Sequence, residues 1–519
     1  MTDALLPLFV AVPILAAGLL FTLGRRRRVQ AAVILALASA STIGGVVLIG
    51  VVGTDGPIAH GVGLWPVGIA IPFAADMFTA LMLTATGFLT VVCSLFAIVA
   101  RTADGRYFAP LALVLLGGVN GALLTADLFN LFVFIEVMLL PSYALLVLAP
   151  PGRGEYHQVS GARLYVTVNL LTSTVFLAGV AFLYGTAGTV NLAELAGAAQ
   201  ESDAVAAAAA VCLFALSIKA AIVPVYGWLA RSYPSTSPAV TALFSGLHTK
   251  VAIYAIYRIY AQLFDGDERY LWIAVTVFSV TMVVGVLAAV GETTTRSILA
   301  FHMVSQIGYI LMGVALFTGA GLAAGIFYLI HHMVVKAALF LSTGAIEVRY
   351  GTGELKRLGG TATREPLIAA AFLVAAFSMA GLPPFSGFVA KLSIVMASLE
   401  AGQVAVVIVM LVVSLVTLLS MLKIWSGVFW GKLPDELVSD ETDETDETDE
   451  STANHVGGGT AVAERPRVRV GVALAAPAVI LALTTVCLGV GAEGLMALAQ
   501  TAADGLLDTS AYTEAVMGS

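Results

Sequence analysis

The chain consists of long apolar runs that are separated by short polar connections. Each run is long enough to cross a bilayer as an α-helix, which takes about 20 predominantly apolar residues. The runs begin near residues 4, 29, 73, 107, 127, 162, 203, 238, 270, 297, 320, 366, 404 and 470. This pattern predicts an all-α polytopic membrane protein with about fourteen transmembrane helices.

Composition and charge lead to the same fold class. Hydrophobic residues make up 59% of the 519 residues and charged residues only 11%, which excludes a soluble globular protein. With an external N-terminus, the cytoplasmic connections hold most of the 25 basic residues, as the positive-inside rule requires. The basic residues Arg25 to Arg28 follow the first apolar run, so this run is predicted to be a retained helix and not a cleaved signal. We therefore expect a multi-pass protein of the cell (plasma) membrane with both termini external, and nothing in the sequence indicates nucleic-acid binding.

Polar segments divide the predicted helices into five parts. The external loop over residues 53–72 contains Gly, Pro and Trp and is expected to form a short hairpin. A block of acidic residues from Asp440 to Glu450 predicts a solvated cytoplasmic linker before the last helix. The expected parts are N-terminal helices 1–4 (1–125), a first inverted repeat (126–262), a second inverted repeat (270–430), the acidic linker (431–469) and the last helix with its tail (470–519).

Two copies of a Pro-x-x-Gly-aromatic pattern support the inverted repeats. Pro224 and Gly227 belong to the first copy, and the second copy contains Pro383, Pro384 and Gly387. An odd number of predicted spans separates the copies, so they face opposite ways across the bilayer, as in transporters with inverted five-helix repeats. Proline removes a backbone donor, so each copy predicts a broken helix whose freed carbonyls need polar partners inside the protein.

Four of the seven lysines lie inside predicted spans, and these are Lys219, Lys250, Lys336 and Lys391. A lysine at the bilayer centre costs roughly 2.5 to 3.5 kcal/mol, and such residues usually mark an ion or proton path. Glu136 lies in a further span, and its approach or departure would switch Lys219 between holding and releasing a proton. The alternative is a static Lys–Glu pair that fixes helix packing. We favour the path, because a packing pair would not require a broken helix beside it.

Histidines fall in the same predicted spans. His332 and Lys336 share a helix face at i,i+4, and histidine titrates near neutral pH, so one of His331 and His332 is predicted to shuttle protons. A metal-ligand pair is the competing interpretation, but no carboxylate or cysteine completes a site there. His248 lies two residues from Lys250 on another face and is either a structural hydrogen-bonding group or a secondary relay. The three cysteines lie singly, so we predict no metal site and no cofactor.

Other charged residues lie near the ends of predicted helices, where anchoring at the membrane interface is the usual role. We interpret four residues in this way, namely Arg258, Glu292, Arg296 and Glu347. No role is assigned to Asp76, Asp127 or Ser305.

Taken together, these segments resemble the family of antiporter-like subunits that Mrp-type cation/proton antiporters share with respiratory complex I. The matching segments are Leu64 to Ile69 with Asp76 to Leu81, the Glu136 helix, Lys219 with its Pro break, Ser237 to Val251, His331 to Phe340 and Gly381 to Phe388. The set is specific, although no single segment would be. The presence of both Glu136 and Lys391, and the short chain beyond the last helix, make the sequence look most like the D-type subunits of Mrp antiporters.

The resemblance implies a hetero-oligomeric complex that exchanges cytoplasmic Na⁺ for external H⁺ through two half-channels joined by a lateral relay. The relay residues would be Glu136, Lys219, Lys250, a histidine, Lys336 and Lys391. Hard cations prefer oxygen ligands, so we expect this subunit to carry the proton while Na⁺ passes elsewhere in the complex. Its partners would be the other Mrp subunits and membrane lipids. The alternatives are a proton-pumping subunit of a complex I-like or membrane hydrogenase redox complex, and an inert scaffold, against which the cost of five buried charges argues.

Overall fold

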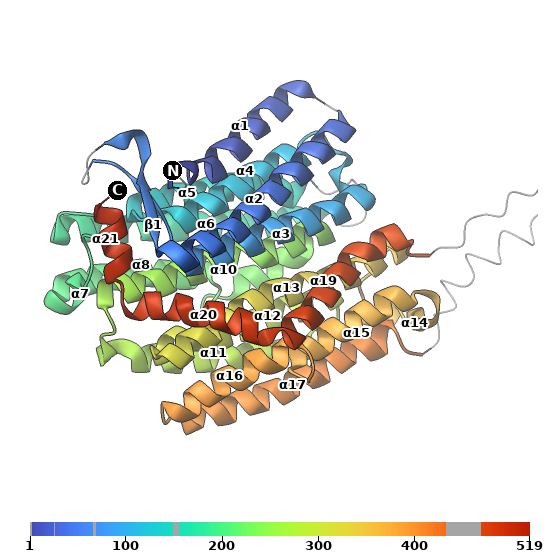
Figure 1. The fold of residues 1–519 in the computed structure, drawn as a ribbon. Coiled ribbons are helices and arrows are strands. Elements are labelled where there is room, and N and C mark those ends of the chain that lie inside the picture. Colours follow the sequence, from blue (N-terminus) through green and yellow to red (C-terminus); the bar gives the residue numbers. More distant parts are fainter. Residues whose placement is uncertain (1–2, 25, 66–68, 149–154, 432–468, 519) are drawn as a thin grey trace, which may run out of the picture.

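The structure is a computed structural model that describes residues 3–24, 26–65, 69–148, 155–431 and 469–518. The predicted acidic linker, with its block from Asp440 to Glu450, lies outside these residues. Long helices run side by side through the molecule (Figure 1). With the short helix α9 (Gly227–Ser232), which follows α8, the bundle consists of α1 (Leu8–Leu23), α2 (Arg27–Asp55), α3 (Met77–Val99), α4 (Phe108–Leu124), α5 (Leu128–Val147), α6 (Glu155–Ala187), α8 (Asp203–Lys219), α10 (Pro238–Ile259), α11 (Leu271–Gly291), α12 (Thr295–Leu316), α13 (Gly319–Tyr350), α15 (Pro366–Ala380), α16 (Ser386–Glu400), α17 (Val404–Val428) and α19 (Val472–Val490).

The all-α membrane fold is confirmed. Within the described residues, 11 helices are long and apolar enough to cross a membrane. Three further elements complete the set, namely the shorter apolar helix α4 and two interrupted helices, α8 with α9 and α15 with α16. The arrangement is consistent with the predicted fourteen spans, whereas the boundaries of the two repeats, 126–262 and 270–430, remain a prediction.

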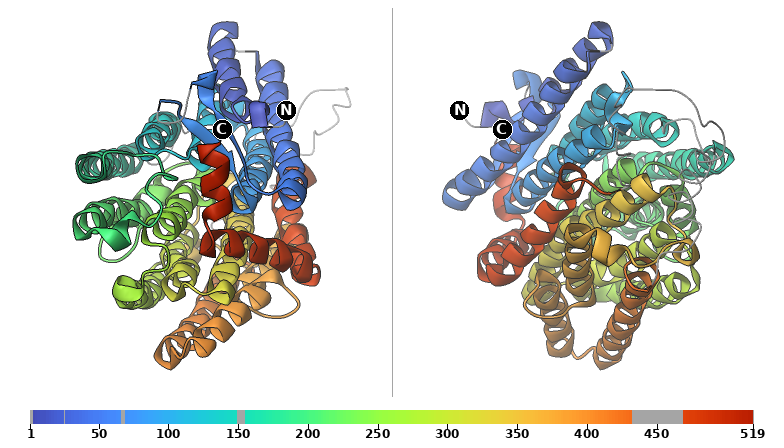
Figure 2. Two further views of the ribbon diagram at one scale, coloured as in Figure 1. Left: turned by 60° about the vertical axis from the view of Figure 1, so that its left-hand side comes forward. Right: turned by 90° about the vertical axis from the view of Figure 1, so that its right-hand side faces the viewer.

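Two helices form the centre of the bundle. Every residue of α10 is buried, and so is every residue of α13 from Gly321 to Ile346. Helices α12, α15, α16 and α19 all pack against α13, and α3 and α8 pack against α10. By contrast, α1 and α2 lie at one side of the bundle and α17 at the other (Figure 2). Each of these helices buries only a stripe of residues. A charge on α10, or on α13 between Gly321 and Ile346, is therefore enclosed by protein on all sides, away from lipid and from bulk water.

A small hairpin and both ends of the described chain lie at one end of the bundle (Figure 1). Strands β1 (Ile58–Gly61) and β2 (Pro72–Ala75) pair in antiparallel fashion, which confirms the predicted hairpin. The loop begins later than predicted, because α2 continues to Asp55. The predicted tail after the last span is also helical: α20 (Ala492–Leu507) packs on α13, and α21 (Ser510–Met517) packs on the hairpin. The short helices α7 (Ala198–Glu201) and α14 (Thr361–Arg364) lie in connections.

The interpretation of Arg258 as an interface anchor is wrong. Helix α10 does not end there but continues as a π-helical turn over Tyr260–Phe264, which keeps Arg258 inside the protein with 2% exposure. Its guanidinium lies 2.6 Å from the carboxylate of Asp76, which is 4% exposed and caps α3. Two of the other predicted anchors, Arg296 and Glu347, form an ion pair with each other between α12 and α13.

Candidate functional site

The four lysines of the predicted spans are all buried. Their exposed fractions are 2% for Lys219, 0% for Lys250 and Lys336, and 7% for Lys391. Among the described residues, none of the four ammonium groups has a carboxylate within the 4.0 Å of an ion pair. An ammonium group without an opposite charge is expensive to bury, so these lysines do not add to stability. We call these four residues the lysine seam.

Neutral oxygen atoms accept hydrogen bonds from the lysine seam. Lys219 Nζ donates to the side-chain oxygen of Asn169 at 3.2 Å, and Lys250 Nζ to the hydroxyl of Thr249 at 3.0 Å. The other two lysines donate to backbone carbonyls of helices. Lys336 Nζ donates to Leu299 O at 3.0 Å. Lys391 Nζ donates to Ala380 O at 3.0 Å and also to the hydroxyl of Ser414 at 2.9 Å. An ammonium has three donors, so each group can still bind water or pass on a proton.

Each predicted helix break is next to one lysine of the seam. In the first, α8 ends at Lys219 and α9 begins at Gly227, so Pro224 lies in the break. The indole N–H of Trp228 donates to Ile218 O at 2.9 Å, which satisfies one carbonyl that the break frees.

In the second break, α15 ends at Ala380 and α16 begins at Ser386, with Pro383 and Pro384 between them. Here Lys391 itself donates to the freed carbonyl of Ala380. Gly387 allows a close approach of two backbones, because a Cβ at this position would lie 1.6 Å from Ser378 O. Thus the second break places a lysine directly on the opened helix end.

Glu136 and Lys219 interact electrostatically but form no ion pair in the described structure. Among the described residues, the Oε1 atom of Glu136 has no hydrogen-bond partner, and neither has the hydroxyl of Tyr143 two turns further along α5. The two groups also act on each other electrostatically. The static Lys–Glu ion pair that was the alternative interpretation is therefore not formed here, and one oxygen of the Glu136 carboxylate is left without a hydrogen bond among the described residues.

His248 is held by hydrogen bonds at both ring nitrogens. Its Nε2 lies 2.8 Å from Ser142 Oγ, and its Nδ1 lies 3.3 Å from the hydroxyl of Tyr165. The ring is also enclosed edge-on by Phe244 and Tyr165. Such a histidine is better suited to fix α10 against α5 and α6 than to exchange protons freely.

The structure separates the neighbouring histidines of α13. His331 points toward α16, where its Nδ1 lies 2.8 Å from Ser386 Oγ. His332 is fully buried, and neither of its ring nitrogens has a hydrogen-bond partner among the described residues. The ammonium groups of Lys250 and Lys336 both act electrostatically on His332. Of the two neighbouring histidines of α13, His332 is therefore the one on which two lysines of the seam act.

The sequence did not single out one further residue near the seam. His302 of α12 is fully buried, and both its ring nitrogens lack hydrogen-bond partners in the described part of the chain. It interacts electrostatically with Lys336 and Lys391. The signal available in the sequence was a histidine seven residues into an apolar span. This signal alone did not indicate a function, because no lysine or carboxylate lies nearby on the same helix.

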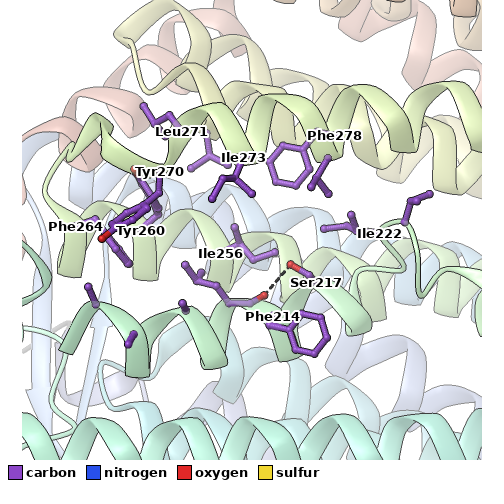
Figure 3. A pocket seen from close by; sticks show the side chains of 18 of the residues that line it. Phe214, Ser217, Ile222, Ile256, Tyr260, Phe264, Tyr270, Leu271, Ile273 and Phe278 are labelled. Carbon is purple, nitrogen blue, oxygen red and sulfur yellow. Dashed lines mark hydrogen bonds between the residues drawn. The ribbon is translucent and has the colours of Figure 1, made fainter. Parts of the chain in front are cut away.

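The described part of the protein contains two sizeable cavities. A polar cavity of about 940 Å³ opens between α6, α9, α12 and α13, and its lining includes Arg163, Arg231, Thr295, Arg296, Glu347 and Arg357. An apolar pocket of about 570 Å³ lies between α8, α10 and α11 beside the first break. Figure 3 shows its walls of Phe214, Ile256 and Phe278, with the Ser217 hydroxyl donating to a backbone carbonyl at 2.8 Å. Of these two, the polar cavity is the one lined by several charged side chains, so it is better suited to hold water.

Comparisons with known proteins place this geometry in a family. The family model described as "NADH:quinone oxidoreductase/Mrp antiporter, TM" matches residues 125–417. The D-type subunit of the Na(+)/H(+) antiporter of Alkalihalophilus pseudofirmus is 37% identical over 88% of this chain and 87% of that protein. The corresponding Na(+)/H(+) antiporter protein of Bacillus subtilis is 31% identical over 98% of each chain.

Solved structures give the same result. A chain of the Mrp complex from Dietzia sp. DQ12-45-1b has a TM-score of 0.92 and 53% identity, with 99% of both chains covered. A chain of respiratory complex I from Thermus thermophilus shares the fold, with a TM-score of 0.76 at 23% identity over 97% of this chain and 99% of that chain. The chain therefore belongs to the NADH:quinone oxidoreductase/Mrp antiporter family, within the group of D-type Mrp subunits.

Proposed function

We propose that this chain is the proton-carrying subunit of a multisubunit Na⁺/H⁺ antiporter of the cell membrane. The observation that carries the proposal is the lysine seam, four buried ammonium groups with only neutral oxygen partners in the described structure. Intramembrane ionisable residues are costly and are usually kept for ion or proton transfer. The relatives named as D-type subunits of Na(+)/H(+) antiporters support the exchange reaction.

The proposed relay begins at Glu136 and follows the seam from Lys219 to Lys391. His332 passes the proton between Lys250 and Lys336, with His331 as the second candidate on α13, and His248 has at most a secondary role. A lysine can hold a proton as an ammonium group and release it as a neutral amine, and a neighbouring charge shifts the balance between these forms. Movement of Glu136 relative to Lys219 would start the transfer, and the breaks at Pro224 and Pro384 would give both end lysines room to move.

Sodium is proposed to pass through another part of the complex. The relay side chains of the seam and of α13 are nitrogen donors, whereas a hard cation such as Na⁺ prefers oxygen ligands. The chain would thus contribute proton transfer alone, as a secondary transporter subunit without an enzymatic reaction of its own.

The mouth of one half-channel is proposed to be the polar cavity between α6, α9, α12 and α13. Arg163, Arg231 and Arg357 line it, and the positive-inside rule assigns such a group to the cytoplasmic side. The hairpin and both ends of the described chain would then be external, and the acidic linker after Gly431 would be cytoplasmic.

The test is Na⁺/H⁺ exchange in everted vesicles that carry the complete complex, measured as Na⁺-induced collapse of a respiration-built pH gradient. Lys219→Ala should abolish the collapse in an assembled complex, whereas the exposed Lys356 gives a matched control, Lys356→Ala, with unchanged exchange. Normal exchange by the Lys219 variant would disprove the relay. No Na⁺ response in a well-assembled parent would instead favour a proton-pumping subunit of a redox complex.

A further inference from the structure

His302 lies in the interior of α12 and is unpaired within the described structure. It is 0% exposed, and neither Nδ1 nor Nε2 makes a hydrogen bond to any described residue. A neutral imidazole carries one donor and one acceptor, and buried polar groups are normally paired. His248 and His331 follow this rule through Ser142 and Ser386. His302 does not, so packing alone does not account for a histidine here.

The position of His302 on its helix places it between two lysines. Leu299, His302, Gln306 and Tyr309 are spaced three and four residues apart, so they form one stripe along α12. Lys336 Nζ reaches this stripe from α13 and donates to Leu299 O at 3.0 Å. Lys391 Nζ reaches it from α16 and lies 5.5 Å from the centre of the Tyr309 ring. His302 is one turn from the first contact and two turns from the second.

The stripe also contains the polar side chains of Gln306 and Tyr309, and a lysine contacts it near each end. Gln306, one turn beyond His302, accepts a hydrogen bond from Tyr328, and its own side-chain nitrogen has no partner among the described residues. The charged groups in the described structure that act on His302 are the ammonium groups of Lys336 and Lys391. An imidazole with two free nitrogens therefore stands between two groups that can each give or take a proton.

We propose that His302 is a further station of the proton relay and carries the proton between Lys336 and Lys391. The inference rests on the proposed function. In one direction, the Lys336 ammonium gives a proton to the free nitrogen of His302, directly or through one water, and becomes a neutral amine. The imidazolium then releases the proton of its other nitrogen to the neutral amine of Lys391, which becomes an ammonium. The ring returns to its first tautomer by flipping or when a proton next passes in the opposite direction.

His331 is less suited to this step although it also lies near Lys391. Its Nδ1 is engaged with Ser386 at 2.8 Å, so taking up a proton at that nitrogen would first require breaking a hydrogen bond. Within the described structure, His302 has no such bond to break. The relay would thus use His332 between Lys250 and Lys336, and His302 between Lys336 and Lys391.

The decisive variant is His302→Gln, tested in the complete complex in everted vesicles. Glutamine is similar in size to histidine and forms hydrogen bonds, but it does not titrate. If His302 had a purely structural role, the glutamine variant would therefore transport at the parental rate. We expect the initial rate of Na⁺-induced gradient collapse to fall at least ~100-fold, the usual contribution of a positioned proton-transfer group. The matched control is Ser305→Ala on the same helix, whose hydroxyl donates to Met282 O on α11 and should not affect the rate.

Lys336→Ala separates this inference from the proposed function. If Lys336→Ala is inactive while His302→Gln exchanges at the parental rate, the role of His302 is wrong and the relay stands. If Lys336→Ala is fully active, the relay itself fails. If the glutamine variant does not assemble, the same exchange rate is measured on His302→Asn. Failure of both variants to assemble would assign His302 to packing and overturn the proposal.

Discussion

Arg258 and Lys250 lie about two turns apart on α10, with 2% and 0% of their surfaces exposed, yet their charges are held in different ways. The guanidinium of Arg258 forms a 2.6 Å ion pair with Asp76, and the ring of Tyr512 lies 4.6 Å from it. Lys250 donates to the hydroxyl of Thr249 and has no carboxylate within ion-pair distance in the described structure. One buried charge is neutralised in place, and the other is not.

This difference separates structural charges from transporting ones. The Arg258–Asp76 pair joins α10 to the N-terminal end of α3, and α21 covers it through Tyr512, so it locks the hairpin end of the bundle. A strongly paired charge holds its proton too firmly to relay it. A lysine with only neutral partners has no opposite charge that holds it in the ammonium form, and this is a useful property for a group that must gain and lose a proton.

The largest expected effect is on stability and comes from Arg258→Met. Removing the guanidinium leaves the Asp76 carboxylate buried without its cation, and breaking one partner of a buried pair costs about 3–5 kcal/mol. The purified complex should melt at a markedly lower temperature and assemble in smaller amounts. Combining this change with Asp76→Asn should restore part of the loss, because no lone charge remains. Unchanged melting of the single variant would show that the pair does not stabilise the fold.

Lys250→Met should have the opposite profile. Methionine fills a similar volume without a charge, so melting should stay the same or rise, as when unpaired buried charges are replaced by apolar groups. Exchange should fall at least ~100-fold, because a proton-transfer group is lost. Thermal melting and vesicle exchange on the same preparation test both statements. A loss of stability as large as that of the Arg258 variant would remove the distinction between the two regions.

The sequence predicted the seam better than it predicted the paired cluster. Lysines in apolar spans are conspicuous because a charge inside the membrane costs free energy. Pro224 and Pro384 mark helix breaks because proline lacks the backbone N–H. Both features can therefore be recognised from the local sequence. Arg258 was misinterpreted because no local signal announces that α10 continues through a π-helical turn to Phe264. Its partner Asp76 is 182 residues away, and such long-range pairs depend on packing that one sequence does not reveal.

The histidines show the same limit within the site. One of His331 and His332 was predicted as a relay because His332 lies one turn from Lys336 on the same helix, whereas the lysines around His302 come from α13 and α16. The roles of His331 and His332 could not be told apart from two adjacent letters. Their separation arises from the helix rotation of α13, which directs one ring to Ser386 and leaves the other unbonded within the described structure.

A smaller effect should distinguish the two helix breaks that place the end lysines of the seam. At Gly387 an added Cβ would lie 1.6 Å from Ser378 O, so Gly387→Ala must shift the backbone beside Lys391. Overpacking of this kind typically costs about 1–3 kcal/mol, and exchange should fall with it. Gly227→Ala is the matched control at the first break, where no described atom lies within 4 Å of the added carbon. Equal losses of exchange in both variants would mean that the glycine acts through flexibility and not through close packing.

The smallest effect is expected where a charge pair lies in water. Asp203 lies 3.3 Å from Arg269, but its side chain is 88% exposed, so solvent screens the attraction. Exposed pairs contribute roughly 0.2–1 kcal/mol, and Asp203→Asn should leave both the melting temperature and the exchange rate close to parental values. Raising the salt concentration should remove any residual difference. A loss of stability comparable with that of Arg258→Met would show that charge pairing matters at this end of the bundle irrespective of burial. Burial would then no longer explain why the Arg258–Asp76 pair stabilises the fold while the lysine seam transports.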